Sequence, residues 1–339
     1  MMSATEYLYL KFSSYAGMFA LQAALHSLVA MVLAESAIIA WEIRDPAVRQ
    51  RFRFLVILVP IAFFPLYQFV DPHRGDVYFR FASLMDSNRW FYLEPVSGMP
   101  VLIAVLAIFT LTAVVFFLQE LMPIAMHLVE KGRGGEEDDP GEVDEASVRK
   151  VQEALDGLPI GMDAVDIFED TELVIFSSTG FDPKVHVSTG LAGAFTAGQL
   201  RVAIAHEIAH IQRSRKPFLI IAYLLRMIAF YNPVSLVVFR KLAQEEEMVC
   251  DDIAVEITGD RESLADAVNL LRPEDEEQAP NDEARGLGGM VSAVERYGLD
   301  LMLAHRAERI SEPRDDESRW RLPYLVTLAS IVGVNYFVV

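Results

Sequence analysis

The sequence predicts a mainly α-helical, polytopic membrane protein with four transmembrane helices and a cytoplasmic α+β domain. Hydrophobic residues make up 53% of the 339 residues, and the mean hydropathy of +0.27 is high for a soluble chain of this size. Four apolar segments approach the ~20 residues that a helix needs to cross a bilayer. The formal net charge of −19 argues against nucleic acid as a direct partner. The single cysteine, Cys250, excludes an intrachain disulfide.

The four expected spans comprise residues 15–41, 54–70, 100–118 and 322–339. The second span contains Pro60 and Pro65, so we expect it to be kinked. The first is preceded by only one basic residue, Lys11, and we expect it to be retained rather than removed as a signal peptide. The spans define an N-terminal three-helix transmembrane region (1–127), a cytoplasmic domain (128–320) and a C-terminal transmembrane helix (321–339).

Basic residues near the spans predict the orientation of the chain. Several arginines follow the first span or precede the last: Arg44, Arg49, Arg51, Arg53, Arg314, Arg319 and Arg321. Positively charged loops favour the cytoplasmic side. Arginines in the loop 71–98 weaken this bias, but the aromatic residues of that loop suit the outer interface. We therefore expect an external N-terminus and a cytoplasmic region 128–320.

An H-E-x-x-H pattern, His206-Glu207-Ile208-Ala209-His210, lies within an apolar helical segment. Thr196 and Gln199 have the spacing of a capping box, so the helix is expected to begin there. Histidines four residues apart lie on one face of a helix and can bind one zinc ion. Glu207, beside them, can take a proton from zinc-bound water. Histidines and a carboxylate buried among apolar residues need such a partner.

Residues 217–239 are apolar enough to resemble a further span. A single crossing would put the motif helix and the acidic residues that follow on opposite sides of the membrane. Asn232-Pro233 supplies a break, because the residue before a proline is pushed away from helical geometry. We therefore expect a membrane-associated helical hairpin within 217–246, with arms at about 218–230 and 234–246. Each arm would be ~20 Å long, too short to span a bilayer comfortably.

Three adjacent glutamates, Glu245, Glu246 and Glu247, leave the third metal ligand ambiguous from chemistry alone. Glu247 shares a helical face with Asp251, which could orient a ligand histidine by a hydrogen bond. Glu246 has the same spacing to Cys250 and is the second candidate. Cys250 itself is expected to be a small packing residue.

The soluble segments around the motif predict a small α+β domain. Helices are expected at 148–158, 262–271 and 291–310, strands at 172–177 and 185–188, and an acidic loop at 272–290. An edge strand of this sheet could pair with an extended peptide. His186 could donate to an oxyanion, although an exposed strand histidine is the simpler interpretation. Two acidic runs, at 136–139 and 274–277, are expected to be solvated loops.

The motifs resemble those of the membrane zinc metallopeptidases typified by the beta-lactam-sensing transducers of the BlaR/MecR type, which are related to the HtpX and CAAX-prenyl-protease zincins. The similar residues occur in the same order: His206-Glu207-Ile208-Ala209-His210, Tyr231-Asn232-Pro233, and Glu247-Met248-Val249-Cys250-Asp251-Asp252. The resemblance covers about 173–271. It implies a zincin-like metalloprotease domain in which His206, His210 and Glu247 bind one Zn²⁺, Asp251 orients a ligand and Glu207 is the catalytic base. Unlike in the transducers, we expect no extracellular sensor domain after the last expected span.

The implied activity is that of a zinc endopeptidase embedded in the inner membrane of a bacterium, with the zinc site facing the cytoplasm. It would hydrolyse protein or peptide substrates at that membrane face, in processing or quality control, with the lipid bilayer as its other partner. The alternative is a signal-transducing protease that cleaves a regulator or repressor in response to a membrane signal. A non-catalytic scaffold is a third possibility, against which the complete set of His206, Glu207, His210 and Glu247 argues.

Overall fold

The computed structural model describes residues 15–74, 76–86, 89, 93, 101–122, 126, 143–178, 180, 182–214, 218–272, 287–311 and 320–339, with side chains of the last long helix described from residue 298. The chain divides into two compact units. The first comprises Met1–Gly135, Phe218–Glu245 and Asp315–Val339, and the second comprises Glu136–Pro217 and Glu246–Arg314. The two acidic runs, and residues 273–286 of the loop expected at 272–290, lie outside the described residues. Residues 287–290, expected to end that loop, are instead the start of a helix, α14 (Leu287–Ser311).

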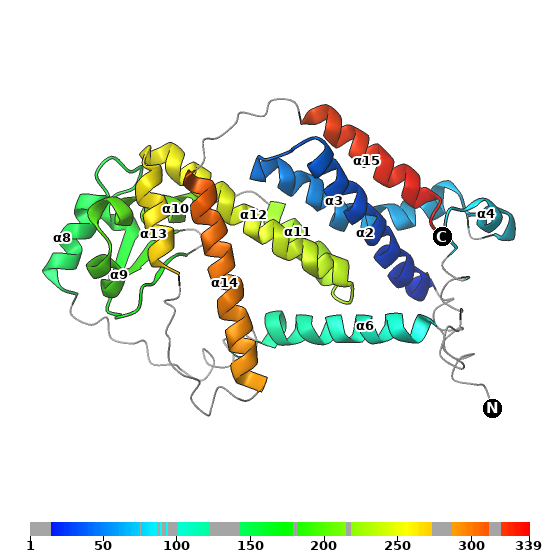
Figure 1. Ribbon diagram of the computed structural model, residues 1–339, viewed down its shortest axis with the longest axis horizontal. Coiled ribbons are helices and arrows are strands. Elements are labelled where there is room, and N and C mark those ends of the chain that lie inside the picture. The colour runs from blue at the N-terminus through cyan, green and yellow to red at the C-terminus, as the bar shows by residue number, and fades with distance from the viewer. Residues whose placement is uncertain are drawn as a thin grey trace. The chain divides into compact units, whose positions relative to one another are not determined.

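The first unit is helical in its described residues. Its elements are α2 (Tyr15–Ala40), α3 (Pro46–Val70), α4 (Val77–Ala82), α6 (Val101–Phe116) with a π-helical continuation η1 (Phe117–Leu121), α11 (Phe218–Ile228), the first part of α12 (Pro233–Thr258) and α15 (Arg321–Tyr336). Helices α2, α3 and α15 pack together, as the blue and red ribbons of Figure 1 show. Their shared core contains small and branched side chains, among them Ala30, Ala34, Val56 and Ile331.

Three described helices are long and apolar enough to cross a membrane: Tyr15–Ala40, Pro46–Val70 and Val101–Leu121. They correspond to the first three expected spans. The second begins earlier than the predicted residue 54, because Asp45 caps it by accepting hydrogen bonds from the backbone of Ala47 and Val48, and Pro46 suits the first turn. The fourth expected span corresponds to α15, which has 16 residues and is not among these three helices. A fourth crossing therefore stays a prediction.

A buried group of charges links three helices of the first unit. The guanidinium of Arg53, on α3, donates to Glu35 of α2 and to Glu245 of α12. Arg49 Nε lies 2.9 Å from Glu245 Oε1, and Lys241 Nζ lies 3.0 Å from Glu35 Oε1. Opposite charges thus accompany one another where the side chains leave water, as buried ions require.

Helices α11 and α12 are the two expected arms, and Asn232-Pro233 separates them. The Asn232 side chain caps α12 through Val234 N at 3.0 Å and donates to Ser27 Oγ at 3.0 Å. The second arm does not end near residue 246 as predicted: α12 continues to Thr258 without a break. Residues 218–245, which contain most of the expected hairpin, fall in the first unit.

The second unit combines helices with a small sheet. Its elements are α8 (Glu145–Ala154), the 3₁₀ turn η2 (Met162–Ala164), β1 (Val165–Phe168), β2 (Ile175–Ser177), β3 (Val185–Ser188), α9 (Thr189–Ala194), α10 (Ala197–Ser214), the rest of α12, α13 (Arg261–Leu270) and α14 (Leu287–Ser311). The described strands have the order β1-β3-β2, with β3 parallel to β1 and antiparallel to β2. Strand β1 was not predicted. Because β3 is central, the edges of the sheet are β1 and β2.

Helix α10 lies at the centre of the second unit. It contacts α8, α13 and β2, and its apolar positions, including Leu200, Val202, Ile204 and Ile208, are buried in one core with residues of the sheet, α13 and α14. At about 25 cal/mol per Å² of apolar surface, such burial is the main stabilisation of the helix. The core thus holds the helix that carries the H-E-x-x-H residues in a fixed position.

Candidate metal centre

The helix that carries the motif begins as the sequence predicts. Thr196 N donates to Gln199 Oε1 at 2.9 Å, and Gln199 N donates to Thr196 Oγ1 at 3.2 Å, so the reciprocal capping box is present. Helix α10 then runs without interruption through the motif. His206 and Glu207 are each only 9% exposed, so both polar side chains lie among apolar neighbours.

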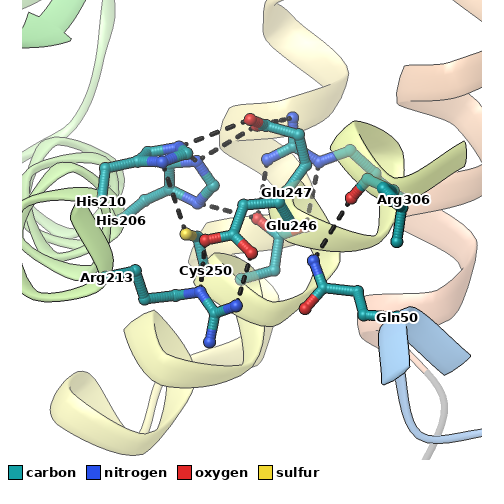
Figure 2. Close-up of polar contacts among 10 residues, drawn as sticks. Gln50, His206, His210, Arg213, Glu246, Glu247, Cys250 and Arg306 are labelled. Carbon is teal, nitrogen blue, oxygen red and sulfur yellow. Dashed lines mark hydrogen bonds and ion pairs between the residues drawn. The ribbon is translucent and has the colours of Figure 1, made fainter. Parts of the chain in front are cut away.

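Two histidines of α10 and one glutamate of α12 bring their side chains together. His206 Nε2 and His210 Nε2 are 3.1 Å apart. Glu247 Oε2 lies 3.5 Å from His206 Nε2, and Glu247 Oε1 lies 3.5 Å from His210 Nε2. Figure 2 shows the two imidazoles pointing toward the Glu247 carboxylate. The three ligand atoms converge on one point in space.

This donor set fits zinc. Ligand atoms about 2.0–2.2 Å from a tetrahedral zinc ion are about 3.3–3.6 Å from one another. The two ring nitrogens are 3.1 Å apart, and each has a different oxygen of Glu247 at 3.5 Å, so the three side chains are close enough to share one ion. Two imidazoles and one carboxylate are also the chemistry of catalytic zinc sites, which keep a fourth position for water or substrate. His206, His210 and Glu247 could therefore hold one such ion.

The partner of His206 on its other ring nitrogen is Asp251. Nδ1 of His206 lies 3.0 Å from Oδ1 of Asp251, an ion-pair contact whose N–H is not aligned as a hydrogen bond. Burial lowers the pKa of His206, but the carboxylates of Asp251 and Glu247 outweigh burial and raise it to about 9. Burial alone would raise the pKa of Asp251. The neighbouring His206 and Arg306 lower this pKa by more than burial raises it, so the net shift is downward. Asp251 is thus an anion with no exposed surface.

The second ring nitrogen of His210, Nδ1, lies against the thiol of Cys250. Its Sγ lies 3.5 Å from His210 Nδ1, and the residue is fully buried. Burial and the neighbouring carboxylates raise the pKa of this thiol, so it remains protonated at neutral pH. Cys250 therefore packs as expected and in addition contacts the outer nitrogen of a candidate ligand.

The three adjacent glutamates have three different sets of neighbours. Glu245 pairs with arginines of α3 in the first unit. Glu246 forms a bidentate pair with Arg213 near the end of α10 (Figure 2). Glu247 alone faces the two histidines. The geometry therefore favours Glu247 among the three candidates that the sequence left open.

Glu207 and His186 are the remaining residues to which the sequence assigned a possible role in the site. Glu207 lies on α10 next to His206 and is buried. His186, on β3, stacks on the ring of Phe176 with centroids 4.7 Å apart and lies 3.8 Å from Asp166. The structure therefore gives His186 partners within the sheet, and its side chain is half-buried and not exposed as the simpler interpretation expected.

Sequence reasoning missed Arg306 of α14. Its guanidinium donates to both oxygens of Asp251 at 2.9 and 2.7 Å, and its Nη1 lies 3.2 Å from Glu247 Oε2. Burial lowers the pKa of Arg306, but Asp251 and Glu247 outweigh burial and raise it. One signal was present in the sequence: Arg306 and Arg309 are three residues apart on a helix and match the adjacent acids Asp251 and Asp252.

Comparison with known families agrees with this geometry. Residues 176–274 match the family model described as BlaR1 peptidase M56. The resemblance predicted from the three ordered motifs is thereby confirmed for this segment, which contains all of α10, α11, α12 and α13 and is less than one third of the chain. The match indicates a peptidase, and together with three apolar helices it indicates a membrane metallopeptidase. No curated protein and no solved structure matches the chain significantly.

Proposed function

We propose that this protein is a membrane-embedded, zinc-dependent endopeptidase that hydrolyses peptide bonds of protein substrates at the cytoplasmic face of a bacterial inner membrane. The observation that supports it most directly is the convergence of His206, His210 and Glu247, with a buried Glu207 beside them on α10. The match of residues 176–274 to a peptidase family supports the same reaction class.

In the proposed mechanism His206, His210 and Glu247 would hold one zinc ion. When bound, zinc would polarise the scissile carbonyl and make a water molecule acidic near neutral pH. Glu207 accepts the proton of the attacking water and then donates it to the leaving amine. Asp251 keeps the imidazole of His206 in the orientation and tautomer that a metal ligand needs.

The membrane setting limits the substrates. The apolar helices and the arms α11 and α12 support placement at a bilayer, where membrane-bound or extended polypeptides are the accessible substrates. The strand β2 of the second unit contacts α10 and is an edge of the described sheet, so it could pair with an extended peptide. Processing or quality control of membrane proteins suits this arrangement.

A second candidate function is signal transduction by cleavage of a regulator. The description of the matched family as a BlaR1 peptidase favours it. In that case the substrate would be one or a few regulatory proteins, and cleavage would depend on a membrane signal.

A comparison of new protein N-termini in cells tests both candidates. Cells would express the wild type, Glu207→Gln or Glu256→Gln at equal levels; Glu256 is an exposed residue of α12 and serves as the control. Glutamine preserves the shape of Glu207 but cannot accept a proton. We expect cleavages that the wild type and Glu256→Gln share and Glu207→Gln lacks. Many such sites in membrane proteins indicate quality control, and one or two in a regulator indicate signalling. Identical N-termini in all three strains, with and without membrane stress, would contradict the proposed activity.

A further inference from the structure

We propose that Arg306 of α14 is a positioning residue of the metal centre, which fixes the carboxylates of Asp251 and Glu247 in the orientations that the zinc ligands need. This inference rests on the proposed zinc function. It extends the site beyond the segment 176–274 that matches the peptidase family, to a helix for which the motifs give no role.

Arg306 uses three nitrogens on two carboxylates at once. Nε and Nη2 form a fork on Asp251, with distances of 2.9 Å to Oδ2 and 2.7 Å to Oδ1. Nη1 reaches Glu247 Oε2 at 3.2 Å. In Figure 2 the Arg306 side chain extends from α14 to the carboxylate of Glu247. A planar guanidinium can make this set of contacts, whereas the single ammonium of a lysine cannot.

The position of the carboxylate oxygens shows why this contact matters for the histidine. Oδ1 of Asp251, which receives the Arg306 hydrogen bond, is also the oxygen 3.0 Å from His206 Nδ1. Asp251 is completely buried, so without Arg306 it would keep an uncompensated charge or turn away to find another partner. Either change would release the ring of His206. Arg306 also holds one oxygen of Glu247, which restricts how that carboxylate can turn toward the histidines.

A neighbouring pair serves as a natural control. Arg309 is one turn further along α14, and its Nη2 donates to Asp252 at 2.6 Å while Nη1 donates to the carbonyl of Met248 at 3.3 Å. This pair joins the same two helices, α14 and α12, with a similar type of ion pair. None of these contacts reaches His206, His210 or Glu247. A purely structural role in holding α14 against α12 is therefore shared by both arginines, and a role in orienting the ligands belongs to Arg306 alone.

The experiment measures zinc affinity of the full-length protein in nanodiscs, by competition between the protein and a chromophoric chelator for Zn²⁺. The variants are Arg306→Gln, Arg306→Lys and the control Arg309→Gln, and thermal unfolding is recorded for each. We expect Arg306→Gln to lower zinc affinity about 10–100-fold, the range found for outer partners of metal ligands. We expect Arg306→Lys to recover only part of this loss and Arg309→Gln to remain within about twofold of the wild type.

A double-variant cycle separates positioning from general destabilisation. If Arg306 acts through Asp251, the zinc affinity of Arg306→Gln/Asp251→Asn will fall less than the sum of the two single losses. Arg306→Lys, which keeps size and charge, gives the answer if Arg306→Gln does not fold. Equal affinities of the Arg306 and Arg309 variants, in a wild type that binds zinc, would overturn the role of Arg306 alone. A wild type that binds no zinc would overturn the proposed function and this inference together.

Discussion

Replacement of Glu245, Glu246 and Glu247 by glutamine, one at a time, should produce three different defects. The three residues are adjacent on α12, yet each carboxylate has its own partners. Glutamine keeps the shape of each side chain and removes only its charge. The three variants therefore compare the roles of the partners at nearly constant helix propensity.

Glu245→Gln should mainly reduce stability. Glu245 and Arg53 form an ion pair whose side chains are 3% and 6% exposed. Loss of one partner from a buried pair costs about 3–5 kcal/mol of folding free energy, compared with about 0–1 kcal/mol for an exposed pair. Because Arg53 retains Glu35 as a second partner, we expect the lower end, about 3 kcal/mol. Zinc affinity should change little.

Glu246→Gln should have a smaller effect on stability and Glu247→Gln a large effect on metal binding. Glu246 forms a charged, bidentate pair with Arg213, for which a loss of about 2 kcal/mol is expected. Glu247 faces both histidines, so its replacement removes one of three ligands and should lower zinc affinity by more than about 100-fold, beyond the effect of an outer partner.

The assays are zinc content after dialysis and unfolding followed by circular dichroism, both on purified protein in detergent micelles. The expected order of zinc loss is Glu247→Gln far above the other two, and the expected order of destabilisation is Glu245→Gln above Glu246→Gln. Loss of zinc in Glu246→Gln with retention in Glu247→Gln would refute the assignment of the third ligand. Equal defects in all three variants would show that the substitutions act through the helix and not through separate partners.

Three further results are expected. In protein stripped of metal by a chelator, zinc uptake at pH 7 should release about one proton, because the pKa of His206 is raised to about 9 and zinc needs the neutral ring. The apparent zinc affinity should therefore rise about tenfold per pH unit from pH 7 to pH 9. Calorimetry in two buffers measures the proton release, and the absence of any release would contradict this prediction. Glu120→Gln should destabilise the protein by about 3 kcal/mol, because it removes the charge that pairs with the buried Arg226. Addition of Arg226→Met to this variant should recover stability, as measured by thermal unfolding. If the losses of the two substitutions were additive, the pairing would be refuted. Gly190→Ala should cost about 1–3 kcal/mol, since a Cβ there would overlap the backbone of Thr171, and an unchanged unfolding midpoint would refute this packing.

Local signals in the sequence predict most of the helices of this fold. The capping box at Thr196 and Gln199 marks the start of α10, and Pro233 marks the start of α12. Such signals depend on residues within one turn, so they can be recognised without tertiary structure. Strand β1 has no such signal: it has four residues, includes Asp166, and is stabilised by parallel pairing with the distant β3. Short strands of this kind depend on their neighbours in space, which a single sequence does not reveal.

The ligand set could be predicted only in part for the same reason. The helical spacing of His206 and His210 shows that they share a face, but the choice among three adjacent glutamates depends on how α12 is rotated toward α10. Spacing to Asp251 favoured Glu247 and did not exclude Glu246. The geometry of the structure favours Glu247, since Glu246 is paired with Arg213 and both histidines face Glu247. Arg306, which contacts Asp251 and Glu247, carries only a weak signal in the sequence, because its spacing to Arg309 matches the adjacent acids Asp251 and Asp252 but belongs to no known motif.

The charges of Glu247, Asp251 and Arg306 explain the raised pKa of His206. Glu247 and Asp251 together contribute two negative charges in a largely buried site, and Arg306 contributes one positive charge, which leaves one negative charge uncompensated. A proton on His206 neutralises it, which is the physical reason that the pKa of this histidine is raised although burial alone would lower it. A divalent cation would compete with that proton for the same histidine. The positive charge of Arg306 opposes both cations, so its expected benefit to metal binding lies in the orientation of the two carboxylates and not in the net charge.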